Sequence, residues 1–240
     1  EAEKVVEDAD ISLNSEIETI RALSEKALEK NRIHKIVLMV DLGDLREGFF
    51  DEGDLFKAVE KILALKGVKL IGIGTNLTCY GGVIPSMEHM DRLNRLKREI
   101  EEKYNIELEI ISGGNSSTLH LLAANDLQGI NNLRLGESLV LGTESAYGQQ
   151  MEGTRNDAFK LQVQIIEVKE KPSVPIGEIG RDAFGQVPTF VDRGVRRRIL
   201  CAVGKQDVDL DSLYPVDKGL VILGASSDHL ILDGSDSEIN

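Results

Sequence analysis

Arginine, glycine and hydroxyl residues recur at the points where apolar runs of this sequence end. Residues 36–40 predict a fully buried strand, and the segment that follows, D-L-G-D-L-R-E-G, presents Arg46 soon after that strand. A guanidinium at the carboxyl end of a strand can bind an anion. The alternative for this segment alone is a strand followed by a solvated, charged loop.

A second segment, S-G-G-N-S-S-T at residues 112–118, joins a predicted strand to a predicted helix. Glycines let a ligand approach the backbone, and Asn115 and Ser116 stand at the helix start, where hydroxyls and free amides favour a phosphate. A plain helix cap, with the glycines serving the turn, explains the segment equally well.

Further candidates follow other predicted strands. Arg134 lies inside an apolar run, L-R-L-G-E, where an arginine needs a partner, and a structural ion pair is the more common case. Gly136 and Glu137 could add backbone amides to the same phosphate site. The glycine-rich segment 72–82 places Asn76 where a substrate could lie, although a surface loop is the alternative.

Two polar segments near the C-terminus, G-K-Q-D at 204–207 and S-S-D-H at 226–229, contain side chains that could act as an acid or base. Solvated loop residues are the simpler interpretation. The four histidines show no metal-ligand spacing and there is no C-x-x-C, so we predict no metal site.

Composition limits the partners. The net charge of −13 argues against nucleic acid, and no apolar stretch reaches the length of a membrane span. With only Cys79 and Cys201 there is no disulfide framework, which favours a reducing compartment, the cytoplasm. The chain begins E-A-E-K-V-V without methionine, so we expect it to be part of a longer protein.

Strands alternate with helices over the first part of the chain, which predicts parallel βαβ units in an α/β fold. We count about five units where a closed barrel needs about eight. We therefore expect a partial TIM-type β/α barrel over residues 1–170, lacking its N-terminal units, followed by a smaller, incomplete β-rich domain over 185–240. The predicted barrel strands are 9–13, 34–41, 68–75, 107–112 and 131–136, and the later β runs are 158–170, 198–203, 219–223 and 229–233.

Taken in order, the segments V-D-L-G-D-L-R-E-G, G-T-N-L-T-C-Y-G-G, S-G-G-N-S-S-T-L-H and L-R-L-G-E resemble the alanine racemase superfamily, and most closely its ornithine racemase-like members. They span residues 40–137. The resemblance implies a pyridoxal phosphate-dependent amino-acid racemase, acting on ornithine or another basic amino acid as a homodimer with shared active sites. The alternative is a non-catalytic pyridoxal phosphate-binding barrel. Such proteins are bare barrels, so the β-rich region favours the enzyme.

The resemblance also implies roles for individual residues. Arg46 matches the arginine that contacts the substrate carboxylate region. Ser116 matches the hydroxyl that holds the cofactor phosphate, with Asn115 beside it. Asn76 falls where the superfamily often has a histidine against the cofactor ring.

Arg134 matches the arginine that hydrogen-bonds the pyridine nitrogen, and Gly136 and Glu137 match backbone donors to the phosphate. Because arginine does not readily give up its proton, the ring stays neutral, and the resemblance implies that this favours Cα proton exchange over transamination.

Racemisation by Cα deprotonation needs two bases, one on each face of the carbanion. The lysine that binds the cofactor covalently belongs on the first barrel strand, and no lysine from Lys4 to Lys218 has that context. Lys205 is the nearest equivalent of the second base, where alanine racemases have a tyrosine. Asp228 lies on the segment that resembles the loop for the substrate carboxylate.

Overall fold

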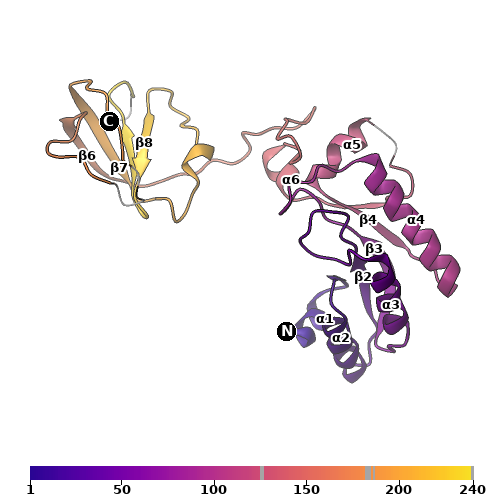
Figure 1. Cartoon of the computed structure of the whole chain (residues 1–240). Helices are drawn as coiled ribbons and strands as arrows, with labels where there is room; N and C mark the ends of the chain where they lie inside the picture. The colour runs from indigo at the N-terminus through magenta and orange to yellow at the C-terminus, as the bar shows by residue number, and fades with distance from the viewer. Residues whose placement is uncertain (125–126, 182–184, 186, 239–240) are drawn as a thin grey trace. The chain divides into compact units, whose positions relative to one another are not determined.

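The computed structural model describes residues 1–124, 127–181, 185 and 187–238. The chain forms two compact units, unit 1 over Glu1–Phe159 and unit 2 over Lys160–Asn240. Figure 1 shows helices and a sheet in the first and a sheet with little helix in the second. Each unit has its own buried apolar cluster.

Unit 1 contains a five-stranded sheet in which every strand is parallel to its neighbour. The strands lie in the order of the sequence, as they do in a β/α barrel. The arrangement is a half-barrel, which confirms the fold class expected from the alternating pattern. The strands are β1 (Ile11–Asn14), β2 (His34–Met39), β3 (Val68–Gly74), β4 (Ile110–Asn115) and β5 (Asn132–Arg134).

Helices connect consecutive strands, and their apolar stripes form the core with the strands. In α3 the buried residues Leu55, Ala58, Val59 and Ile62 recur at three- and four-residue spacing, which places them on one face. Each fully buried leucine or isoleucine contributes roughly 1.5–3 kcal/mol to folding. The helices of unit 1 are α1 (Ala2–Asp8), α2 (Ile17–Glu29), α3 (Glu52–Leu63), α4 (Met87–Tyr104), the 3₁₀ turn η1 (Ser116–Thr118), α5 (Leu119–Ala124) and α6 (Glu137–Leu141).

Local signals fix where these helices begin. The Asp51 carboxylate accepts a hydrogen bond from the Asp54 amide at the start of α3. Ser86 and His89 form a reciprocal capping box at the start of α4. These caps set the lengths of the loops that follow β2 and β3, and those loops carry several of the candidate residues.

Unit 2 contains a four-stranded antiparallel sheet in the order β6-β7-β9-β8. We expected the barrel to extend to residue 170, but β6 pairs with β7 of unit 2. The two compact units meet between Phe159 and Lys160. The sheet carries a small core around Ile199, Cys201 and Leu232. The elements are β6 (Ile165–Pro172), β7 (Val195–Cys201), the 3₁₀ turn η2 (Leu210–Ser212), β8 (Val221–Ala225) and β9 (Leu230–Asp233).

Among the helices in the described ranges, none is both long enough and apolar enough to cross a membrane.

Candidate active site

Most of the predicted site residues gather at the carboxyl ends of β2 to β5. Because parallel strands end at the same edge of a sheet, side chains that are distant in sequence become neighbours there. Asn115 at the end of β4 pairs in register with Arg134 at the end of β5. Ser116, the next residue, contacts the segment that follows β5 through the amide of Gly136. The segment after β2 carries Arg46, and the segment after β3 carries Asn76.

Arg134 is a partly buried cation held by neutral acceptors. Its Nη1 donates to Ser112 Oγ at 2.6 Å, and its Nη2 donates to the Thr75 carbonyl oxygen at 3.0 Å. Burial lowers the pKa of Arg134, while the nearby Glu47 and Cys79 act in the opposite direction. Within the described residues no carboxylate forms an ion pair with it, so the structural ion pair that the sequence left open is not the arrangement found.

The hydroxyl of Ser116 lies at the centre of a small group of donors. Its Oγ accepts from the backbone N–H groups of Gly136 and Ser138, both at 3.3 Å, and lies 3.1 Å from Ser138 Oγ. Ser116 is buried, and the Asn115 carboxamide beside it accepts from the Ser117 amide at 2.8 Å. Hydroxyls and backbone amides at the start of helical turns suit the oxygens of a phosphate.

A chain of polar contacts joins the loops after β2, β3 and β4. Arg46 forms a two-pronged ion pair with Glu47, whose Oε1 accepts from Arg46 Nη2 at 2.8 Å and from Asn76 Nδ2 at 3.2 Å. Asn115 Nδ2 donates to Asn76 Oδ1 at 2.7 Å. The guanidinium of Arg46 holds the pKa of Glu47 below its ordinary value.

Glu47 is a residue that sequence reasoning missed. The signal was present, because an acidic side chain directly follows the arginine of the first motif. The ion pair also shows that the positive charge of Arg46 already has a negatively charged partner. Its guanidinium is already oriented by a carboxylate, and its side chain remains 47% exposed.

Asp44, also without an assigned role in the sequence analysis, ties two of these loops together. Its Oδ2 accepts from the amides of Cys79 at 3.1 Å and Tyr80 at 2.8 Å, and its Oδ1 accepts from the amide of Val83 at 3.2 Å. Burial by itself raises the pKa of Asp44, but the backbone hydrogen bonds outweigh burial and the pKa is lowered. The loop after β2 is thereby anchored to the loop after β3.

Glu137 begins α6, and its carboxylate accepts from Thr143 Oγ1 at 3.4 Å. The side chain is exposed. Gly136 precedes it and donates its amide to Ser116.

Lys205 and Asp228 belong to unit 2, on two adjacent loops. The Lys205 amide donates to the Ser226 carbonyl oxygen at 3.0 Å. Hydrogen bonding from Ser227 lowers the pKa of Asp228, whose carboxylate also lies 3.2 Å from His229 Nδ1. A pocket of about 610 Å³ is lined by residues 205–211, which include Lys205.

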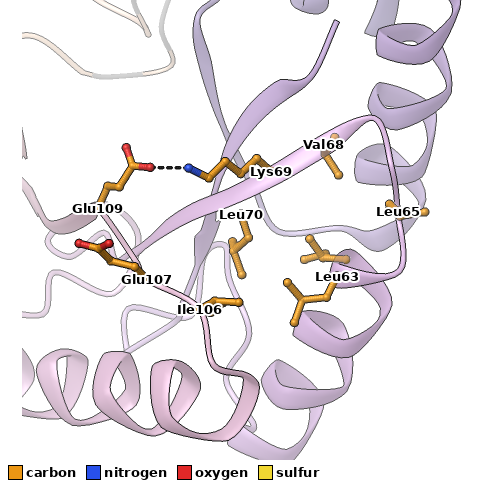
Figure 2. A pocket seen from close by; sticks show the side chains of 9 residues that line it. Leu63, Leu65, Val68, Lys69, Leu70, Ile106, Glu107 and Glu109 are labelled. Atoms are coloured by element: carbon orange, nitrogen blue, oxygen red, sulfur yellow. Dashed lines mark hydrogen bonds and ion pairs between the residues drawn. The ribbon is translucent and has the colours of Figure 1, made fainter.

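A pocket of about 320 Å³ lies at the amino end of β3, away from the carboxyl-end residues (Figure 2). Apolar side chains such as Leu63 and Leu70 line it, and Lys69 pairs with Glu109 at 2.6 Å at its rim. It contains none of the predicted site residues.

The comparisons with known proteins concern the family and the fold. Residues 1–144 match the family model described as "Alanine racemase, N-terminal domain". The chain is 52% identical to ornithine racemase of Acetoanaerobium sticklandii over 238 residues, covering 99% of this chain and 67% of the relative. It is 43% identical to lysine racemase of Thermotoga maritima over 237 residues, covering 97% of this chain and 66% of the relative.

The fold is similar to that of the crystal structure of alanine racemase from a D-cycloserine-producing Streptomyces lavendulae, with a TM-score of 0.66 at 17% identity. That alignment covers 100% of this chain and 63% of the other. The chain therefore spans about two thirds of the length of the proteins it matches. From the family model and the two racemases, the chain belongs to the alanine racemase N-terminal domain family.

Proposed function

We propose that the complete protein that contains this chain is a pyridoxal phosphate-dependent racemase of a basic amino acid, with ornithine as first candidate and lysine as second. The names of the two relatives, ornithine racemase and lysine racemase, support the substrate class. The observation that carries the proposal is that the strand end before Ser116 pairs with the strand end at Arg134, and that Ser116 accepts from the amide of Gly136 just beyond it.

The residues present fit the cofactor. Its phosphate needs several hydrogen-bond donors, and the hydroxyl and amides around Ser116 supply them, with Gly136 and Glu137 opening the next helical turn. Its pyridine nitrogen needs a donor that does not transfer its proton. Arg134 is such a donor, because a guanidinium does not readily give up its proton. The hydroxyl of Ser112 and the carbonyl oxygen of Thr75 orient it.

Bound pyridoxal phosphate supplies an electron sink that acidifies the Cα–H bond of an amino acid. The residues of this chain would bind the cofactor and orient the substrate beside it. Arg46 would bind the substrate carboxylate in the orientation that Glu47 imposes. Asn76 and Asn115 would pack beside the ring. Asn115 donates to Asn76, and Asn76 donates to Glu47.

The residues of unit 2 complete the proposal. Lys205 would hold or deliver a proton on one face of Cα, and Asp228 lies on the adjacent loop, where the family resemblance expects substrate contacts. We propose a cytoplasmic homodimer in which unit 2 of one subunit completes the site of its partner. A core of its own makes unit 2 a folded module suited to that role, and it favours the enzyme over a bare cofactor-binding barrel.

The test is an absorption spectrum of the complete gene product before and after borohydride, followed by polarimetry with L- or D-ornithine and then lysine. A borohydride-sensitive cofactor band together with loss of optical rotation is the expected result. A band without any change in the rotation of basic amino acids would indicate a binding protein instead. Absence of a band after added pyridoxal phosphate would refute the cofactor assignment.

A further inference from the structure

The position of Arg134 depends on a second, buried residue. Of its two described side-chain contacts, one is to a backbone carbonyl oxygen and the other, at 2.6 Å, is to Ser112 Oγ. Ser112 is only 1% exposed. It therefore acts as a fixed acceptor from within the sheet, where water is not an easy substitute.

The hydroxyl of Ser112 has a defined direction because a third residue takes its proton. Ser112 Oγ donates to Asn132 Oδ1 at 2.7 Å, which leaves an oxygen lone pair for the guanidinium. Each hydrogen bond is donated in the same direction: Arg134 donates to Ser112, and Ser112 donates to Asn132. Ser112 and Asn132 are also register partners of β4 and β5, so the sheet itself holds them together.

Space for this arrangement comes from a glycine on the neighbouring strand. A Cβ atom at Gly74 would lie 2.9 Å from the Ser112 Cβ, closer than such atoms approach. The absence of a side chain at Gly74 thus lets β3 and β4 approach at this point. The Thr75 carbonyl oxygen, one residue further along, supplies the other contact to Arg134.

We propose that Ser112, supported by Asn132, is a positioning residue that fixes the guanidinium plane of Arg134 against the cofactor ring. The inference rests on the proposed function, because it assigns Arg134 to the ring nitrogen. A guanidinium fixed at two corners presents its remaining N–H groups in one direction. Loss of the Ser112 contact would let it tilt, admit water to the ring nitrogen and permit protonation there.

The predicted consequence is a change in what the site does, beyond a loss of rate. A protonated ring favours transamination, in which the proton removed from Cα returns to the cofactor carbon instead of Cα. Hydrolysis then releases a 2-keto acid, and the amino group stays on the cofactor. In the complete protein, Ser112→Ala should lower kcat about 10-fold with a smaller change in KM, and raise keto-acid release per racemisation event several-fold.

Asn132→Ala provides a second variant at an exposed position, where a truncation costs less stability than in the core. It removes the acceptor of the Ser112 proton and should shift the same two quantities in the same direction by a smaller factor. Ser24→Ala is the matched control, because Ser24 is a buried serine whose Oγ accepts from the Gly67 amide at 3.0 Å, far from the carboxyl-end residues. It should leave the keto-acid ratio unchanged.

A spectroscopic readout separates positioning from a general structural effect. We would titrate the absorption band of the bound cofactor with pH, and expect a pH-dependent transition in Ser112→Ala that the wild type and Ser24→Ala lack. If the wild type racemises ornithine but both site variants match the control in keto-acid ratio and titration, the role of Ser112 is refuted. If the wild type shows no cofactor band or racemisation, the proposed function itself fails.

Discussion

Asp44 offers a direct test of how the candidate site is held together. Its carboxylate accepts three backbone N–H groups from the loop after β3, all within 3.2 Å, and only 1% of the residue is exposed. Hydrogen bonds to a charged group contribute roughly 1.5–3 kcal/mol each, and they are not additive because the loop relaxes. We expect Asp44→Ala to lower the free energy of unfolding by about 3–4 kcal/mol.

Asp44→Asn is the more specific test because the asparagine side chain has nearly the same shape as aspartate and differs in charge and in one acceptor. The amide oxygen can still accept from Cys79 and Tyr80, but the amide nitrogen then faces the Val83 N–H, donor against donor. The expected loss is about 1–2 kcal/mol. Asp91→Asn is the control, since Asp91 is exposed on α4 and has no described side-chain contact. It should change stability by less than about 0.5 kcal/mol.

The assay is denaturant unfolding of the complete protein, at pH 7 and in steps down to pH 3. The pKa of Asp44 is lowered in the folded protein, so its contribution is present above the ordinary carboxyl pKa of about 3.9 and is lost as the pH falls below it. The stability gap between wild type and Asp44→Asn should therefore narrow below about pH 4. A gap that stays constant with pH, or equal stabilities at pH 7, would refute the reasoning.

Two further predictions concern ion pairs in different units. Glu47→Gln should raise the KM for the amino acid several-fold with a smaller change in kcat, because Arg46 loses the charge that orients it. The control Glu109→Gln removes an ion pair at the amino end of the sheet, and an unchanged KM in both variants would contradict the role of Glu47. In unit 2, burial raises the pKa of Asp233, but Arg196 and the hydrogen bonds from Ser235 together outweigh burial, and the pKa falls to about 2. Asp233→Asn should therefore cost about 2 kcal/mol at pH 7 in thermal or denaturant unfolding, a difference that should vanish as the pH falls from about 4 to about 2.

The sequence predicted the half-barrel because its strands and helices carry their periodicities plainly. Each of the five predicted strands overlaps an observed one, from β1 at Ile11–Asn14 to β5 at Asn132–Arg134. The division of the chain was harder to place. Residues 158–170 alternate like a half-exposed strand, and only the pairing of β6 with β7 shows to which sheet it belongs.

Site residues could be predicted from the sequence where a motif contains the reactive or binding group itself. They could not be predicted where a residue acts by orienting another residue. Arg134 and Ser116 stand out by type and position, and the structure places them at the ends of neighbouring strands. Glu47, Asp44 and Ser112 act by orienting other side chains or loops. Such contacts depend on the distance between strands and loops, which cannot be predicted from a single sequence.

The outer strand of unit 2 has a consequence for how this protein behaves in concentrated solution. Within the described residues β6 lies at one edge of the four-stranded sheet, and an edge strand can pair with strands of other molecules. It carries Glu167, Lys169 and Lys171 and ends at Pro172. Charges and a terminal proline make this edge a poor template for edge-to-edge aggregation.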